Sequence, residues 1–322
     1  MNDKVSLTPF IRFIETALNT KASGDPTKYF HLLNQLQQHE DAETLRRTYL
    51  GLANCVEIFT QKPAEYKELI HSIFAYQFRS SQEVTHAFIQ LVLQIVSFDG
   101  IFSIPAMHMV AKNFKYIALN DSKCIDENSL MLLHTTLQVV IHLAPSSVTK
   151  LFSILSDEFP KKKSSRNCIN VYITQLLVVA DYVPCLKDML FAKITQHCIK
   201  NDLCIARRSE YETLSNDEKY FSDEAMTRLD VYMSLLLKYI ENAFEDSNNG
   251  QSTDKKEVIM SLYKCLLTNY KNFVLPKDTK YAQYLMFFIC AKAESFSETI
   301  GFGLGEAFLE EMLNIHKNRQ EK

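Results

Sequence analysis

The chain has 322 residues and a formal net charge of −3, from 35 Lys and Arg against 38 Asp and Glu. Only 7 residues are glycine, which disfavours doubly wound nucleotide-binding folds, propellers and sandwiches, because these need glycine at tight turns and close backbone approaches. Nucleic-acid affinity depends on neutralising several phosphates, so a chain without a basic excess is a poor candidate for direct, sequence-specific DNA binding.

Apolar residues recur at helical spacing along most of the chain. The first clear series, with alternating steps of four and three residues, is Leu45, Tyr49, Leu52, Val56 and Phe59. The same steps begin again at Val84 and at Ala225. This spacing places one apolar stripe on an α-helix, and no sustained period-two alternation typical of strands accompanies it. The pattern predicts an all-α protein.

Four prolines mark a repeat of about 40 residues. They are separated by 42, 40 and 39 residues and are Pro63, Pro105, Pro145 and Pro184. The helices predicted before them span Glu43–Thr60, Gln82–Phe98, Ser129–Leu143 and Asn167–Val183. The helices predicted after them span Ala64–Phe78, Ala106–Ala118, Ser146–Phe159 and Cys185–Ile199. Because proline suits the first turn of a helix, these units predict a HEAT-like helical-repeat solenoid of antiparallel helix pairs.

The repeat spacing changes after the fourth unit. A fifth unit, Glu257–Phe273 followed by Lys277–Ala291, has its proline 92 residues after Pro184, which leaves room for one further helix and two loops. Residues 205–224 contain six acidic and three basic side chains, a composition typical of a solvated linker. The predicted organisation is therefore N-terminal helical repeats over 1–204, an acidic linker over 205–224, and further repeats of the same solenoid over 225–322.

No spacing in the sequence indicates catalysis, a metal site, a cofactor site or a membrane span. The glycine cluster at 301–305 lacks the third glycine position and the βαβ setting of a dinucleotide site, so a helix-starting turn is favoured. His197, Cys198 and Cys204 lack the spacing of metal ligands, and free cysteines favour buried positions. The uncharged stretch Asn128–Thr149 contains too many polar residues for a bilayer core and predicts a buried helix. We therefore expect a non-enzymatic protein without metal or cofactor.

Two kinds of feature are candidates for partner binding or phosphoregulation. The first is a basic run formed by Lys161, Lys162, Lys163 and Arg166. It either forms a solvated loop, or serves nuclear import, phosphate contact or recognition by a kinase. The second is a set of serine pairs at predicted helix entrances: Ser80 and Ser81, Ser146 and Ser147, and Ser164 and Ser165. Each pair either caps the following helix or carries a regulatory phosphate, and Glu83 completes a capping box with Ser80.

An ordered set of sequence blocks is shared with a known family. The clearest block is RLDVYMSLLLKYI at 228–240, and it is followed by Leu275-Pro276, QYLMFFIC at 283–290 and EAFLE at 306–310. These blocks resemble, in order and spacing, the RLDxxMSLxxxYI and LP…QFxxFYLC…EAFLE blocks of the RNA polymerase I-specific transcription initiation factor family, also called TIF-IA. The resemblance covers about residues 30–316.

The resemblance implies a non-catalytic HEAT-repeat adaptor of the nucleus and nucleolus that binds RNA polymerase I and helps recruit it to ribosomal DNA promoters. Promoter-bound initiation factors are implied as further partners. The resemblance also implies a serine-rich face that contacts the polymerase, and phosphorylation of this face weakens the binding. Residues 205–224 resemble an acidic insertion that is common in the family. A generic helical-repeat scaffold for other protein partners and an enzyme on a helical scaffold are the alternatives.

Members of the family are about twice as long as this chain, so we expect a piece of a longer protein, a short isoform or a divergent member. The resemblance therefore implies nothing about surfaces in the half of the family members that this chain does not match, and these surfaces include the contacts with promoter factors. Apolar residues near the end are spread too widely for one buried stripe: Phe302, Leu304, Phe308, Leu309, Met312, Leu313 and Ile315. Because a solenoid normally ends in a polar cap, we expect this end to be covered by a homodimer partner or to promote aggregation.

Overall fold

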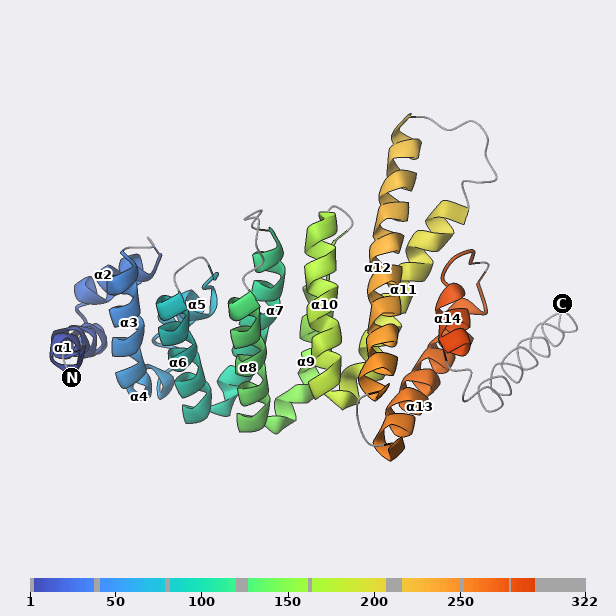
Figure 1. The fold of residues 1–322 in the computed structure, drawn as a ribbon. Helices are drawn as coiled ribbons and strands as arrows, with labels where there is room; N and C mark the ends of the chain where they lie inside the picture. The colour runs from blue at the N-terminus through green and yellow to red at the C-terminus, as the bar shows by residue number, and fades with distance from the viewer. Residues whose placement is uncertain are drawn as a thin grey trace, which may run out of the picture. The chain divides into compact units, whose positions relative to one another are not determined.

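The computed structural model describes residues 3–37, 41–78, 82–119, 127–161, 164–206, 216–248, 252–277 and 279–292. These residues form α-helices, short 3₁₀ turns and one π-helical segment, and no strand occurs among them (Figure 1). The prediction of an all-α fold is therefore confirmed. The chain divides into two compact units, Met1–Phe159 and Pro160–Lys322.

The first unit is a stack of antiparallel helix pairs (Figure 1). Its helices are α1 (Asp3–Ala22), α2 (Thr27–Gln37), α3 (Ala42–Asn54), α4 (Val56–Thr60), α5 (Lys67–Phe74), α6 (Gln82–Phe98), α7 (Ser103–Leu119), α8 (Glu127–Leu143) and α9 (Val148–Asp157). In one layer α6 packs against α3 and α8, and in the other α7 packs against α5 and α9. This pairing is the helical-repeat arrangement that the proline spacing predicts.

The second unit is also built from packed helices. Its helices are α10 (Arg166–Tyr182), α11 (Lys187–Ala206), α12 (Asn216–Asn248), α13 (Ser252–Asn269) and α14 (Tyr284–Lys292), and a π-helical segment (Tyr270–Val274) follows α13. The long helix α12 packs against both α10 and α11. The Tyr239 hydroxyl of α12 donates a hydrogen bond to the Asp181 carboxylate near the end of α10.

Three of the four repeating prolines lie at helix entrances, in two different positions, whereas Pro63 lies in the turn before α5, so the helix predicted from residue 64 begins later, at Lys67. Pro145 and Pro184 each begin a 3₁₀ turn, Pro145–Ser147 and Pro184–Leu186, that leads into α9 and α11. Pro105 instead lies inside the first turn of α7, which begins at Ser103, so the helix predicted from residue 106 starts earlier than expected. At both positions the missing N–H of proline costs no backbone hydrogen bond, because the N–H groups of the first helical turn have no intrahelical partner.

The predicted linker over 205–224 is helical at both of its described ends. Residues 205 and 206 close α11, and residues 216–224 form the beginning of α12, while 207–215 lie outside the described residues. The Glu224 carboxylate pairs with Arg228 one turn later, so this acidic residue of the predicted linker lies on a helix. The compact units divide at 159/160 and not within this segment.

Buried polar side chains fix the loops between helices in both units. In the first unit, Asn113 of α7 accepts a hydrogen bond from the Phe78 amide at 2.9 Å and donates to the Tyr76 carbonyl at 3.1 Å, which holds the loop after α5. In the second unit, the fully buried Asp202 carboxylate of α11 accepts from the amides of Lys280, Tyr281 and Ala282 just before α14. Three amide donors offset the cost of burying this charge.

Two of the sequence predictions concern residues outside the described part of the chain. They are the helix-starting turn at the glycine cluster 301–305 and the covered apolar segment near the C-terminus. Among the helices that the structure describes, none alone is long and apolar enough to cross a membrane. Within the same described residues, α8 and Pro145–Asp157 together have sufficient length and apolar character, but the pair is bent by 111°.

Candidate partner-binding surfaces

The serine pair at 146 and 147 lies in the 3₁₀ turn between α8 and α9. The Ser147 hydroxyl is buried and donates to the Ala144 carbonyl at 2.6 Å, and it makes no capping bond to α9. The capping interpretation is therefore wrong for Ser147, because the turn that begins at Pro145 directs its hydroxyl back toward α8. Ser146 is exposed, and its carbonyl accepts from the Thr149 hydroxyl. Of this pair, Ser146 is the one accessible to a modifying enzyme.

The pair at 164 and 165 stands at the beginning of α10. Ser165 is the N-cap, with extended backbone, and its hydroxyl accepts from the Cys168 amide at 3.2 Å. This confirms the capping interpretation for Ser165. Ser164 is half-buried, and its amide donates to the Lys161 carbonyl at 2.9 Å. The exposed serine at 165 thus combines a capping role with an accessible side chain.

The basic run places two described charges beside this cap. Lys161 is exposed before the cap, and Arg166 is exposed as the first residue of α10. Four of the predicted candidates lie outside the described residues: Ser80, Ser81, Lys162 and Lys163. The start of α10 therefore combines a helix N-terminus, an accessible hydroxyl and two exposed cations, a combination suited to an anionic group.

The buried thiols of Cys198 and Cys265 and the half-buried His197 belong to helix packing in the second unit, whereas Cys204 is exposed, against the expectation of a buried position. Burial raises the pKa of Cys198 and, together with the adjacent Asp188, the pKa of Cys265. Burial, and secondarily Lys193 and Lys200, lowers the pKa of His197 to about 4. These thiols are protonated and this imidazole is neutral at pH 7, so neither offers an activated nucleophile. No group of three or more His, Cys, Asp or Glu side chains in the described part of the chain is placed to hold a metal ion.

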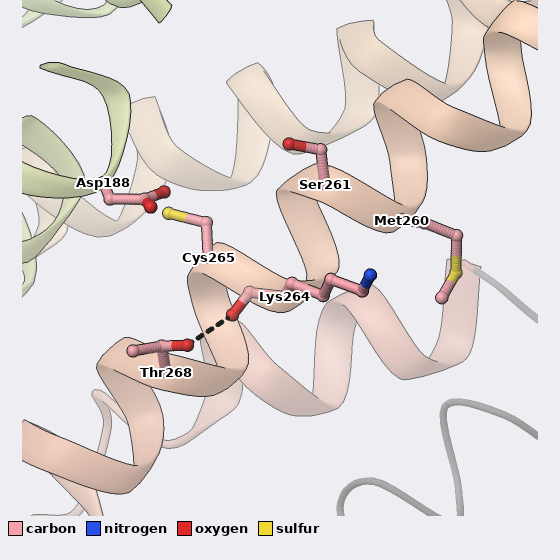
Figure 2. Close-up of a pocket in the computed structure, with 6 residues that line it drawn as sticks. All are labelled: Asp188, Met260, Ser261, Lys264, Cys265 and Thr268. Atoms are coloured by element: carbon pink, nitrogen blue, oxygen red, sulfur yellow. Dashed lines mark hydrogen bonds between the residues drawn. The ribbon is translucent and has the colours of Figure 1, made fainter. Parts of the chain in front are cut away.

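An open depression of about 460 Å³ lies between α11 and α13 in the second unit. Figure 2 shows the residues that line it: Asp188, Met260, Ser261, Lys264, Cys265 and Thr268. The Asp188 carboxylate faces the Cys265 sulfur, and the Thr268 hydroxyl donates to the Lys264 carbonyl at 2.9 Å (Figure 2). A carboxylate beside a thiol opposes thiolate formation, so this arrangement does not favour nucleophilic catalysis.

A second depression, of about 530 Å³, lies in the first unit between α6 and α8. Its lining residues are His86, Ile89, Gln90, Leu93, Gln94, Ser97 and Leu143. Helical periodicity does not identify this groove, because its shape depends on how closely α8 approaches α6.

Comparison with known proteins gives consistent matches. The model of the family described as RNA polymerase I specific transcription initiation factor RRN3 matches residues 3–224 and 207–320. The mouse (Mus musculus) RNA polymerase I-specific transcription initiation factor RRN3 is 24% identical over 294 residues, which cover 77% of this chain and 43% of the mouse protein. The chain thus spans less than half the length of this relative.

A solved structure matches over most of the chain. The crystal structure of RNA Polymerase I Transcription Initiation Factor Rrn3 superposes with a TM-score of 0.71, covering 91% of this chain and 58% of that one. The sequence identity in this match is 19%, so the likeness shows the helical-repeat fold.

Proposed function

This chain belongs to the family of RNA polymerase I specific transcription initiation factor RRN3, and on that premise we propose that it is a non-catalytic adaptor that binds RNA polymerase I. Recruitment of the polymerase to ribosomal DNA promoters, in the nucleolus, is part of the same proposal. The observation that carries it is the family match, which extends from residue 3 to residue 320. The helical-repeat fold supports it, because stacked helix pairs provide extended surfaces for protein partners.

We place one polymerase contact at the start of α10, where Lys161, Ser165 and Arg166 are exposed. These two cations suit an acidic surface on the partner, and charge complementarity of this kind mainly raises the association rate. A phosphate on Ser165 would neutralise the cations locally and so weaken that contact. The N-terminus of α10 would tolerate the phosphate, because the helix dipole favours negative charge there. Phosphorylation of Ser165 would therefore weaken binding to the polymerase without destabilising the fold.

Ser146 is the second proposed regulatory position, and it lies in the other unit. Its side chain is exposed, but no basic residue stands beside it within the turn Pro145–Ser147. A phosphate there adds negative charge to this turn, which opposes binding to an acidic partner. We therefore expect phosphorylation of Ser146 and of Ser165 to weaken polymerase binding in the same direction.

The experiment is retention of purified RNA polymerase I by the immobilised, dephosphorylated chain. We expect the wild-type chain to retain polymerase, and charge reversal at both Lys161 and Arg166 (Lys161→Glu, Arg166→Glu) to weaken retention about tenfold or more at low salt. Lys67→Glu, at an exposed lysine of α5, is the matched control and should retain polymerase normally. Absence of polymerase from the wild-type chain would overturn the proposed function and favour a scaffold for other partners.

A further inference from the structure

A small buried cavity lies in the second unit, between α11, the end of α13 and α14. Its volume is about 10 Å³. Thr195 of α11 and Asn269 of α13 line it together with apolar and aromatic side chains, and every lining residue is at most 5% exposed. A buried space of about 10–15 Å³ holds one water molecule, so this cavity has room for a single water and not for an organic ligand.

The Thr195 hydroxyl on the α11 wall is buried without a partner. Thr195 is 2% exposed, and its Oγ1 has no hydrogen-bond partner in the described part of the chain. A threonine inside a helix commonly donates to the carbonyl four residues earlier, as Thr136 does to Leu132 at 2.7 Å. Thr195 makes no such bond to Phe191. Because a buried hydroxyl without a hydrogen bond is costly, this group indicates a partner inside the cavity.

The α13 wall supplies a second polar group, the side-chain amide of Asn269. Its Nδ2 donates to Cys265 Sγ at 3.6 Å, a long contact with a weak acceptor. A carboxamide has two N–H donors and an oxygen that accepts two bonds, so most of its hydrogen-bonding capacity remains. Asn269 is the last residue of α13 before the π-helical segment Tyr270–Val274, which also lines the cavity.

The position of Thr195 on α11 directs it toward these elements. Thr195 and Asp202 are seven residues apart, which is about two helical turns, so both lie on the same face of α11. That face anchors the segment before α14, because the Asp202 carboxylate accepts from the amides of residues 280–282. Helix α11 also packs against α13 and the π-helical segment.

We propose that this cavity binds one structural water molecule, which bridges the Thr195 hydroxyl and the Asn269 amide and so links α11 to the end of α13. Two protein partners satisfy the minimum of two to four hydrogen bonds that buried waters make. A metal ion does not suit the cavity, because none of its lining residues is Asp, Glu, His or Cys. The water site does not depend on RNA polymerase I as a partner.

The test counts long-lived internal waters by water ¹⁷O magnetic relaxation dispersion on the full chain. We expect Thr195→Val, which replaces the hydroxyl with a methyl group of similar shape, to lose one long-lived water. Thr195→Ser keeps the hydroxyl and should keep the water. Thr136→Val is the matched control and should lose none, because Thr136 is also buried in a helix but its hydroxyl already bonds the Leu132 carbonyl.

Urea unfolding provides a readout whose sign separates a hydrated cavity from a dry one. With the water bound, Thr195→Val removes one of its partners, so the urea midpoint should fall below that of wild type and by more than in Thr136→Val. In a dry cavity, valine would instead remove an unpartnered hydroxyl and raise the midpoint.

Three results would overturn the proposal. The first is an unchanged number of long-lived waters in Thr195→Val, and the second is a raised urea midpoint in that variant. The third needs no variant: a high-resolution crystal structure of the wild-type chain without electron density between Thr195 and Asn269. An unchanged water count with the same midpoint shift as Thr136→Val would assign the Thr195 hydroxyl to the Phe191 carbonyl instead.

Discussion

The Asp202 carboxylate gives the sharpest stability prediction. It is fully buried and accepts three backbone hydrogen bonds, at 3.2 Å from Lys280, 2.8 Å from Tyr281 and 2.8 Å from Ala282. Asp202→Ala removes the acceptor that these three amides share. A buried amide that loses its hydrogen bond costs about 1–3 kcal/mol, and the amides of Lys280 and Tyr281 are only part-buried, so water compensates them in part. We therefore expect the free energy of unfolding of the second unit to fall by about 3–5 kcal/mol.

Asp202→Asn separates hydrogen bonding from burial. The amides of Tyr281 and Ala282 both donate to Oδ2, whereas Lys280 donates to Oδ1. An asparagine that places its carbonyl at the Oδ2 position keeps two bonds and turns its own N–H₂ toward the Lys280 amide. We therefore expect Asn to cost about 1–3 kcal/mol, clearly less than Ala.

Urea unfolding of the full chain measures these losses, and hydrogen exchange at the amides of residues 280–282 measures the local effect. Faster exchange should be confined to the Lys280 amide in Asp202→Asn and extend to all three amides in Asp202→Ala. Asp230→Ala, at an exposed position of α12, is the control and should stay within about 0.5 kcal/mol of wild type. Equal losses for Ala and Asn, or unchanged exchange, would refute the reasoning.

Three further predictions concern other described residues. Asn113→Ala should cost about 2–4 kcal/mol in urea unfolding, because the Phe78 amide loses its acceptor; a loss below 1 kcal/mol would contradict this. The pKa of His197 is lowered to about 4 in the folded protein, compared with about 6.5 in the unfolded protein. Between these two pH values the unfolded protein binds the proton more readily, so the free energy of unfolding falls as the pH falls through that range. After allowance for its partial exposure we expect a loss of about 1 kcal/mol from pH 7 to pH 5, absent in His197→Gln; an identical pH slope in that variant would exclude His197 as the cause. Ser165→Ala should lower stability by about 1 kcal/mol and Ser165→Asp should leave it nearly unchanged in thermal melts, since Asp is an equally good N-cap; equal destabilisation by both would contradict the capping role.

The candidate site was only partly predictable from sequence. The Ser165 cap followed from a serine before an apolar helical pattern, which is a local relation. Ser147 has the same local appearance, but the 3₁₀ turn after Pro145 rotates its hydroxyl toward Ala144. The depression beside α6 has no local sequence signal, because its extent depends on where Leu143 at the end of α8 comes to lie against α6.

The sequence by itself determined the all-α class, the position of most helices and the family. Gln82–Phe98 was predicted with the bounds that α6 has, because its apolar stripe buries Val84, Phe88 and Ile95 at helical spacing. Acidic composition did not distinguish a linker from a helix, since charged side chains suit both, and only the structure shows that residues 216–224 begin α12. The role of Asp202 was likewise a tertiary result. Its three donors lie about 80 residues further along the chain, and a contact of that separation leaves no periodic trace in sequence.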